Sequence, residues 1–186
     1  MKVLIACEFS GIVREAFAKR GHDAWSCDFL PSEIPGKHLQ CDMRELDYSG
    51  WDMLIAFPPC TYLCSSGARW WKGKEKQQAA AIDFVLWVAS LPVPCIAIEN
   101  PVGKLSTMWR KPDQIIQPWR FGHGETKTTC LWLKNLPCLT PTNIVEGRIA
   151  RVHHESERPD RWKRRSRTLK GIAEAMAEQW DRQVVG

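Results

Sequence analysis

The sequence has no apolar run that approaches the roughly 20 residues needed to cross a bilayer, and no apolar segment follows a basic start at its amino terminus. These absences predict a cytosolic protein with no membrane partner. No CxxC pair occurs, and the adjacent His153 and His154 have no nearby cysteine, so no metal site is predicted. Internal repeats and low-complexity segments are also missing, which predicts a single domain of 186 residues.

Cysteine and tryptophan, by contrast, are frequent. Eight cysteines would indicate disulfides in a secreted chain, but most of them lie inside apolar segments, as reduced cysteines of a protein core do. Ten tryptophans are many for this length, and most are expected in the core. Trp70 and Trp71 instead follow Cys60 in a polar, basic stretch, where they either anchor a loop or stack on a base.

Buried strands and amphipathic helices alternate along the chain. Apolar runs predict strands at residues 2–7, 23–28, 39–42, 51–57, 94–99, 114–119 and 128–133. Helical spacing predicts a first helix capped by Ser10 and stopped by Gly21, a long helix over 74–90 and a closing helix over 169–180. This alternation is typical of an α/β fold with a doubly wound, mainly parallel sheet.

Cys60 stands at the end of the most informative apolar run. Residues 54–57 have the pattern of a buried strand, Pro58 and Pro59 stiffen the turn after it, and the thiol follows at the carboxyl end of the strand. Open α/β sheets bind their ligands at this end of the strands. The thiol is therefore a candidate nucleophile, with a buried structural cysteine as the alternative.

Polar groups also follow other predicted strands. The first strand leads into Phe9-Ser10-Gly11, where a glycine before a helix lets a ligand approach the backbone. The second strand ends in Asp28, the third in Asp42 and the fifth in Glu99. A single acid at a strand end is more often a cap than a ligand. Together with Cys60, these groups predict a nucleoside cofactor site beside a thiol and a carboxylic acid.

Positive charge is concentrated near the carboxyl end. Between Arg148 and Lys170 nine lysines or arginines stand against three acids, although the net charge of the chain is only +5. A solvated loop is the simpler interpretation, but this density, with Trp162 interleaved, favours contact with phosphates. The candidate nucleic-acid contacts in this segment are Arg161, Arg164, Arg165 and Arg167.

These motifs, in this order, resemble those of the DNA cytosine-5 methyltransferases over roughly residues 1 to 135. Phe57-Pro58-Pro59-Cys60 is similar to the family's catalytic motif, and Glu99-Asn100 to its E-N pair. The resemblance implies a Rossmann-like fold of the S-adenosylmethionine-dependent methyltransferase type. It also implies that S-adenosylmethionine is bound by residues of the first half of the chain, which are Phe9, Ser10, Gly11, Asp28, Phe29, Asp42, Met43 and Pro59.

Two departures from the family pattern bear on the expected enzyme. In the family, a Q-x-R-x-R strand supplies cations to the target cytosine. Residues 125–129 stand in its place here, and Lys127, which alone keeps a positive charge, is the candidate for that role. Only 34 residues, 134–167, separate the last predicted strand from the last helix, too few for the family's target-recognition domain. The resemblance thus implies a minimal single-domain enzyme with a short basic segment in that place, in which residues 166–169 represent the motif that closes the cofactor pocket.

The implied reaction is transfer of a methyl group to carbon 5 of cytosine in single- or double-stranded DNA, with low sequence selectivity, in a bacterial or phage-infected cell. Cys60 would add to carbon 6 of the base, and Glu99 would donate a proton to ring nitrogen 3. The base must be flipped or already unpaired. Ser65, Trp70 and Trp71, in the segment that resembles the family's mobile loop, are the candidates for contact with the strand.

Two other functions stay open from the sequence. Without a recognition domain, the same chemistry could act on a free deoxycytidine nucleotide or transfer a group other than methyl, although a mononucleotide needs few of the cations in the basic segment. A catalytically idle DNA-binding relative is the alternative from another class. The presence of both Cys60 and Glu99 argues against it, because a binding protein needs neither.

Overall fold

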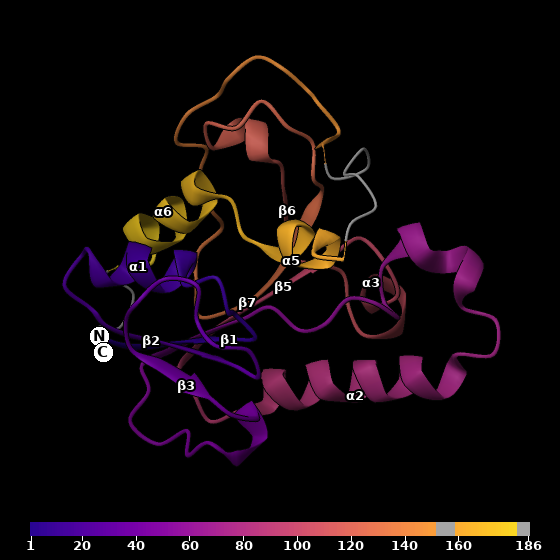
Figure 1. The fold of residues 1–186 in the computed structure, drawn as a ribbon, viewed down its shortest axis with the longest axis horizontal. Helices are drawn as coiled ribbons and strands as arrows, with labels where there is room; N and C mark the ends of the chain where they lie inside the picture. Colours follow the sequence, from indigo (N-terminus) through magenta and orange to yellow (C-terminus); the bar gives the residue numbers. More distant parts are fainter. Residues whose placement is uncertain (152–158, 182–186) are drawn as a thin grey trace.

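The computed structural model describes residues 1–151 and 159–181, so His153 and His154 lie outside the described residues. Its centre is a seven-stranded sheet with the order β3-β2-β1-β4-β5-β7-β6 (Figure 1). In chain order the strands are β1 (Lys2–Ala6), β2 (Asp23–Asp28), β3 (His38–Gln40), β4 (Met53–Ala56), β5 (Cys95–Pro101), β6 (Gln114–Ile116) and β7 (Thr129–Lys134).

The described part of the chain also contains five α-helices and three 3-10 helices, of which α5 and α6 follow the last strand. The α-helices are α1 (Ile12–Ala18), α2 (Glu75–Ser90), α3 (Leu105–Met108), α5 (Arg161–Ser166) and α6 (Lys170–Gln179). The 3-10 helices are η1 (Met43–Glu45), η2 (Ser65–Trp70) and η3 (Pro118–Arg120).

The sheet is mainly parallel, as the alternation of strands and helices predicts. β1 pairs in parallel with β2 and β4, β2 pairs in parallel with β3, and β4 pairs in parallel with β5. β7 runs antiparallel to both of its neighbours, β5 and β6. The carboxyl ends of the first five strands therefore lie at one edge of the sheet, where the predicted site residues follow them.

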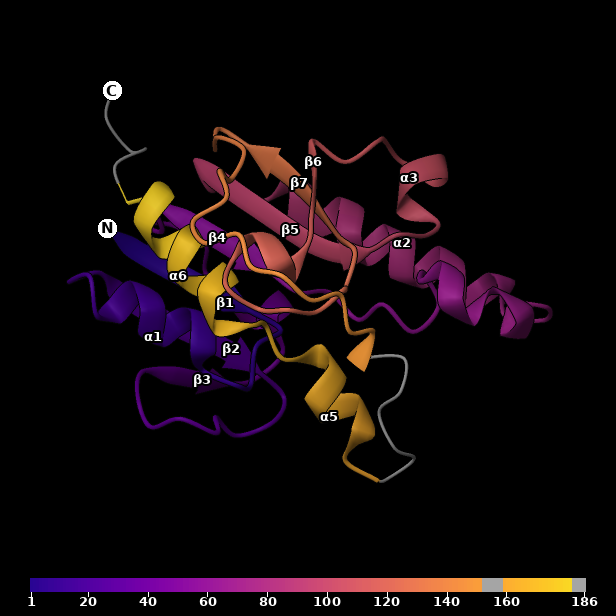
Figure 2. The same ribbon diagram turned by 90° about the horizontal axis from the view of Figure 1, so that it is seen from above.

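Successive residues of β1 face opposite sides of the sheet, so each side has its own core. Val3 and Ile5 belong to one buried cluster, and Leu4 and Ala6 belong to the other. Both faces are covered by helix, as expected for parallel strands with near-continuous apolar sequences. Figures 1 and 2 show α1 and α6 on one face and α2 on the other.

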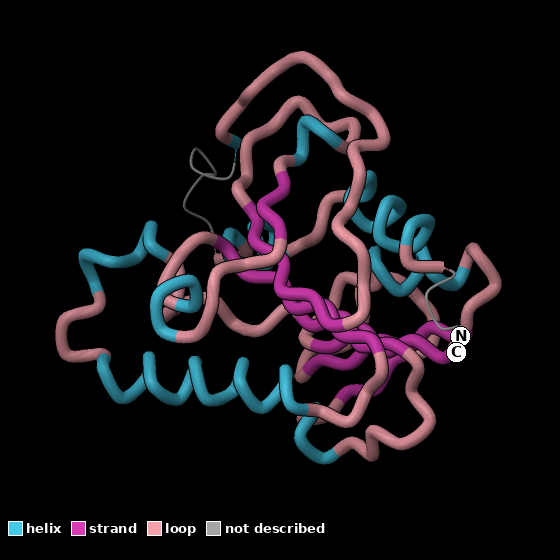
Figure 3. Tube along the Cα trace, turned by 180° about the vertical axis from the view of Figure 1, so that it is seen from behind, coloured by secondary structure: helices cyan, strands magenta, loops and turns pink. Residues whose placement is uncertain are grey.

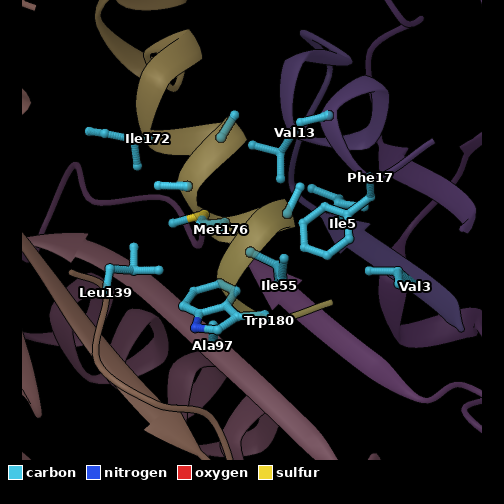
Figure 4. Close-up of a cluster of buried hydrophobic side chains, with 14 of the residues drawn as sticks. Val3, Ile5, Val13, Phe17, Ile55, Ala97, Leu139, Ile172, Met176 and Trp180 are labelled. Carbon is cyan, nitrogen blue, oxygen red and sulfur yellow. The ribbon is translucent and has the colours of Figure 1, made fainter. Parts of the chain in front are cut away.

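The contact between α1 and α6 forms the centre of the first core cluster. Phe17 of α1, Met176 of α6 and the adjacent Trp180 are fully buried there, and Figure 4 shows them between the two helices and the sheet. The Trp180 indole nitrogen also donates a hydrogen bond of 3.0 Å to the carbonyl of Pro137. The closing helix predicted from its apolar spacing thus seals one face of the sheet.

Several elements are shorter than predicted, for identifiable reasons. The third strand ends at Gln40 because the Asp42 side chain accepts from the backbone of Arg44 and begins η1. The sixth strand ends at Ile116 because Pro118 cannot donate to the ladder and begins η3. A helix also forms at α5, inside the basic segment, where no apolar periodicity predicts one.

The cap of α1 differs in part from the expectation. Gly11, not Ser10, occupies the N-cap position. The Ser10 hydroxyl does accept from the backbone of Ile12 at 3.3 Å, and the buried Glu8 carboxylate accepts from the backbone of Val13 at 2.9 Å. The first amide groups of the helix are thus satisfied mainly by an acid two residues before the predicted cap.

All eight cysteines are free thiols in the structure. Three of them are buried in the core, at positions 27, 95 and 130, in agreement with their apolar sequence surroundings. In the part of the chain that the structure describes, no helix combines the length and apolar character that a bilayer crossing requires.

Trp180 provides a test of the first core cluster. Trp180→Ala should lower the free energy of unfolding by about 3 to 5 kcal/mol, because it removes a fully buried indole and leaves a cavity between α6 and the sheet. Trp70→Ala is the matched control, since the Trp70 side chain is 69% exposed, and its effect should stay within about 0.5 kcal/mol. Equal destabilisation of the two variants in urea titrations would contradict the packing described here.

Candidate functional site

The turn after β1 is built around a buried carboxylate. Glu8 Oε1 accepts from the Ser10 hydroxyl at 2.8 Å and from the Val13 backbone, whereas Glu8 Oε2 has no hydrogen-bond partner among the described residues. Burial raises the pKa of Glu8, while these hydrogen bonds and Arg14 oppose the rise. Cys7, at the end of β1, takes a positive φ of 57°, a conformation that is uncommon outside glycine.

Gly11 is required by the geometry of this turn. Its φ is 74°, and a Cβ atom at this position would lie 2.7 Å from the guanidinium of Arg14. Arg14 is itself buried and donates to Ser26, Ser32 and the carbonyl of Ile34, so it cannot move aside without breaking these hydrogen bonds. The predicted cofactor turn is therefore held against the loop that follows β2.

Two acids lie beside this turn at the ends of β2 and β3. Asp28 is half-buried and accepts from the backbone of Leu30 at 2.9 Å, and burial raises the pKa of its carboxyl. Both Asp28 and Asp42 act electrostatically on the Cys7 thiol, whose pKa is raised to about 12, mainly by burial. The structure thus brings the two predicted acids together around the end of β1.

The apolar residues predicted beside these acids differ in exposure. Phe29 is 70% exposed, so its ring is free to contact a ligand, whereas Met43 is buried and its sulfur lies 3.7 Å from that of Cys7. Phe9 is also buried, and its ring centre lies 6.0 Å from that of Trp162 in α5.

The turn that carries Cys60 is fixed to the neighbouring strand. The buried side chain of Asn100, in β5, donates a hydrogen bond of 2.8 Å to the carbonyl of Pro58. The backbone carbonyl of Cys60 then accepts from the amides of Leu63 and Cys64, which begins a helical turn. Pro59 and Cys60 are exposed at the surface of this turn. The bond from Asn100 couples the position of the thiol to the strand that carries Glu99.

Cys60, Glu99 and Lys127 form a second group at the carboxyl edge. Although Cys60 is exposed on its turn, the surrounding protein partly desolvates its thiolate, and this is the main reason why its pKa is raised to about 11. The charges of Glu99 and Cys64 also raise the pKa, and the charge of Lys127 lowers it. Burial also raises the pKa of the Glu99 carboxyl, against the effect of Lys127 and a hydrogen bond with Thr129. The group therefore contains a thiol and a carboxylic acid that both resist ionisation, beside one cation.

The predicted loop after Cys60 is η2, and it is joined to the segment after β5. The Ser65 hydroxyl and backbone amide both bond to the carbonyl of Val102, each at 2.9 Å. The Lys104 ammonium lies 4.9 Å from the centre of the Trp71 ring, while the Trp70 ring is exposed. Trp71 thus anchors the loop, whereas the side chain of Trp70 is exposed on the surface of the loop.

The basic segment folds back over both groups. The Lys127 ammonium donates to the carbonyl of Arg165 at 3.1 Å, and Arg167 makes a bidentate ion pair with Glu33 at 2.6 and 2.8 Å. Arg164 pairs with Asp160 at 2.7 Å. Arg161, Arg164, Arg165 and Arg167 are half-buried rather than fully exposed. At least two of the four predicted phosphate contacts are therefore already engaged with carboxylates.

The segment after α5 reaches the group of Cys60, Glu99 and Lys127. Thr168 and Leu169, which the resemblance identifies with a pocket-closing motif, line a narrow cavity beside Glu99 and Lys127. The structure thus brings the end of the basic segment to the cavity at Glu99.

Sequence reasoning gave no role to Glu8 and Arg14, which organise the site, and named Asn100 only as part of the E-N pair. Glu8 and Arg14 are polar side chains in an apolar helix-start pattern, and only their burial reveals their role. The motif did not reveal that the Asn100 amide donates to the carbonyl of Pro58, because that hydrogen bond joins two segments far apart in the sequence.

Comparison with known proteins supports the fold described above. No family model and no curated protein sequence matches the chain. A solved structure of a candidate DNA modification methyltransferase encoded within a prophage in E. coli matches with a TM-score of 0.52 and 15% sequence identity. The match covers 77% of this chain, which spans only about half, 51%, of the other chain. The likeness shows a Rossmann-like fold of the methyltransferase type.

The charges around Cys60 can be tested by alkylation. Glu99→Gln should lower the pKa of Cys60 below about 11, because it removes a neighbouring negative charge that disfavours the thiolate. Lys127→Gln should raise the pKa, because it removes a stabilising cation. At pH 9 the Cys60 peptide should be alkylated by iodoacetamide about three- to tenfold faster in the first variant and correspondingly slower in the second.

The exposed thiol of Cys138 serves as the internal control for these rates. Its alkylation, followed by mass spectrometry of its own peptide, should be the same in all three proteins. If the alkylation rate of Cys60 changed in the same direction in the two variants, the arrangement of charges around Cys60 would be contradicted.

Proposed function

We propose that this protein is a DNA (cytosine-5) methyltransferase that uses S-adenosylmethionine, with Cys60 as its nucleophile. The observation that carries the proposal is the convergence of Cys60, Glu99 and Lys127 at the ends of three neighbouring strands. A thiol, a carboxylic acid that resists ionisation and a cation form a set suited to covalent activation of a heterocycle. A structural cysteine would need none of these neighbours.

The cofactor is proposed to bind at the ends of β1, β2 and β3. Asp28 and Asp42 would accept hydrogen bonds from the ribose hydroxyls and the adenine amino group, and the exposed ring of Phe29 would contact the adenine. The unpartnered oxygen of Glu8 and the backbone of the turn at Phe9, Ser10 and Gly11 would bind the polar groups of the rest of the molecule. Pro59 and Met43 would border this site. When bound, S-adenosylmethionine supplies an electrophilic methyl group.

The chain's own residues would perform the activation of cytosine. The Cys60 thiolate adds to carbon 6, and the displaced electron pair makes carbon 5 nucleophilic. Glu99, whose pKa is raised by burial, holds the proton that ring nitrogen 3 takes up. Lys127 stabilises the thiolate and the charge that develops on the ring. After alkylation, loss of the carbon 5 proton to solvent base re-forms the double bond and releases the Cys60 thiolate, and ring nitrogen 3 returns its proton to Glu99.

DNA is the favoured substrate over a free nucleotide. The basic segment covers the site, and the structural neighbour is itself described as a DNA modification methyltransferase, which supports a polynucleotide. Arg161 and Arg165, together with the exposed Trp70 of η2, are the proposed contacts with the strand. Ser65 and Trp71 would position this loop, and Arg164 and Arg167 would reach phosphates only by exchanging their carboxylate partners.

Loss of the nucleophile tests the reaction. Cys60→Ser should reduce transfer of labelled methyl groups to DNA by more than about 10⁴-fold, because a serine hydroxyl cannot form the covalent adduct. Its affinity for S-adenosylhomocysteine should stay within a factor of two or so of the parent, since Cys60 is not a proposed cofactor contact. Cys138→Ser, at an exposed thiol, is the matched control and should keep full activity. A fully active Cys60→Ser variant would exclude the mechanism.

Loss of the two acids tests the cofactor site. Asp28→Ala and Asp42→Ala should each weaken the calorimetric affinity for S-adenosylhomocysteine by about 0.5 to 1.5 kcal/mol, or roughly two- to tenfold, because each removes a hydrogen-bond acceptor. Asp47→Ala removes an exposed carboxylate whose hydrogen bonds, among the described residues, come from Ser49, and it should leave the affinity unchanged. Unchanged affinity in both test variants would remove these acids from the site.

A further inference from the structure

A lobe built almost wholly of loops rises above the sheet. It consists of residues 117–127, which follow β6, and residues 139–151, which follow β7, and Figures 1 and 3 show it as long loops with one short helical turn. The two segments run side by side through backbone hydrogen bonds, among them one of 3.0 Å from the amide of Thr126 to the carbonyl of Ile149. The lobe is thus an organised surface and not a pair of independent loops.

Two guanidinium groups lie over one tryptophan in this lobe. The guanidinium carbons of Arg120 and Arg148 lie 5.0 and 4.0 Å from the centre of the Trp119 ring. The Trp119 carbonyl accepts from the amide of Val145 at 3.0 Å, and the Arg148 guanidinium donates to the carbonyls of Val145 and Gly147. Arg148 is therefore held by two hydrogen bonds and by the Trp119 ring, and Arg120 is held by the ring.

Within the described residues, these two cations have no carboxylate partner. Among residues 1–151 and 159–181, no carboxylate lies within ion-pair distance of Arg120 or Arg148. The lobe contains two acids, Glu125 and Glu146, and Glu125 already pairs with Arg151 at 2.9 Å. The Trp119 surface is consequently a fixed patch of positive charge.

The lobe rises from the same edge of the sheet as the proposed catalytic group. Ile116 at the end of β6 pairs with Thr129, and Thr129 pairs with Pro101 at the end of β5. Lys127, the last residue of the first lobe segment, lines the cavity beside Glu99. A strand whose base entered this group would therefore have its neighbouring phosphates close to the lobe.

We infer that Arg120 and Arg148, held on Trp119, bind phosphates of the DNA strand that flank the target base. The inference rests on the proposed function and extends it to a surface outside the basic segment. Guanidinium groups match the geometry of phosphate, and groups that are already ordered lose little conformational entropy on binding. Because the contacts are to the backbone, they add affinity without sequence preference.

The salt dependence of DNA binding tests this inference. Each phosphate contact contributes roughly 0.7 to 0.9 to the slope of log affinity against log salt, so the double variant Arg120→Gln with Arg148→Gln should flatten the slope by about 1.4 to 1.8. The matched control is Lys19→Gln with Lys37→Gln, which removes the same charge at the amino edge of the sheet and should keep the parental slope. Affinity for S-adenosylhomocysteine should be the same in all three proteins.

The single variant Arg120→Gln and the activity of the parent protein distinguish a failure of the lobe inference from a failure of the proposed function. Arg120→Gln alone, at a side chain whose described contact is the Trp119 ring, should flatten the slope by about 0.7 to 0.9 even where the double variant folds poorly. A parental slope in both Arg120 variants, with methyl transfer to DNA intact in the parent, would overturn the lobe inference alone and point to a protein partner at the exposed Ile144 and Ile149. A parent protein that neither binds nor methylates DNA would overturn the proposed function itself.

Discussion

The parallel pairing of β4 between β1 and β5 is the constraint on which the whole site depends. Neighbouring strands lie about 4.8 Å apart, so the turns that follow these three strands are forced into contact at one edge. The hydrogen bond from Asn100 to the carbonyl of Pro58 then fixes the turn of Cys60 against the strand of Glu99. The acids at the ends of β2 and β3 are held on the other side of β1, where Arg14 ties the following loop to α1.

The carboxyl-terminal segment joins the two halves of this edge. Trp162 contacts Phe9 of the proposed cofactor turn, Arg165 accepts from Lys127 of the proposed catalytic group, and Arg167 pairs with Glu33 in the loop after β2. The contacts at Phe9 and Glu33 join residues more than a hundred positions apart in the sequence, and the three contacts together connect the turn after β1, the loop after β2 and the segment before β7. A change in the basic segment therefore reaches both the proposed cofactor turn and Lys127 of the proposed catalytic group, which makes the segment part of this edge as well as a candidate surface for phosphates.

The sheet and its main helices could be predicted because buried parallel strands and amphipathic helices leave strong local patterns. The runs at β1 and β4 are almost wholly apolar, and the closing helix repeats its apolar residues at helical spacing. The helix α5 has no such pattern, because its contacts are made by Trp162 and by backbone groups. The buried charges of Glu8 and Arg14 and the lobe around Trp119 depend on long-range hydrogen bonds, which no local window of sequence encodes. The roles of the site residues remain predictions.

Covalent capture of the base tests the central proposal most directly. DNA in which fluorine replaces the carbon 5 hydrogen of cytosine cannot lose that position as a proton, so an adduct formed after methyl transfer should persist. Incubation of the protein with this DNA and S-adenosylmethionine is expected to give a stable protein–DNA adduct, and mass spectrometry of the digested adduct should locate the base on Cys60. An adduct at another residue, or the absence of any adduct while unmodified DNA is methylated at carbon 5, would contradict the account.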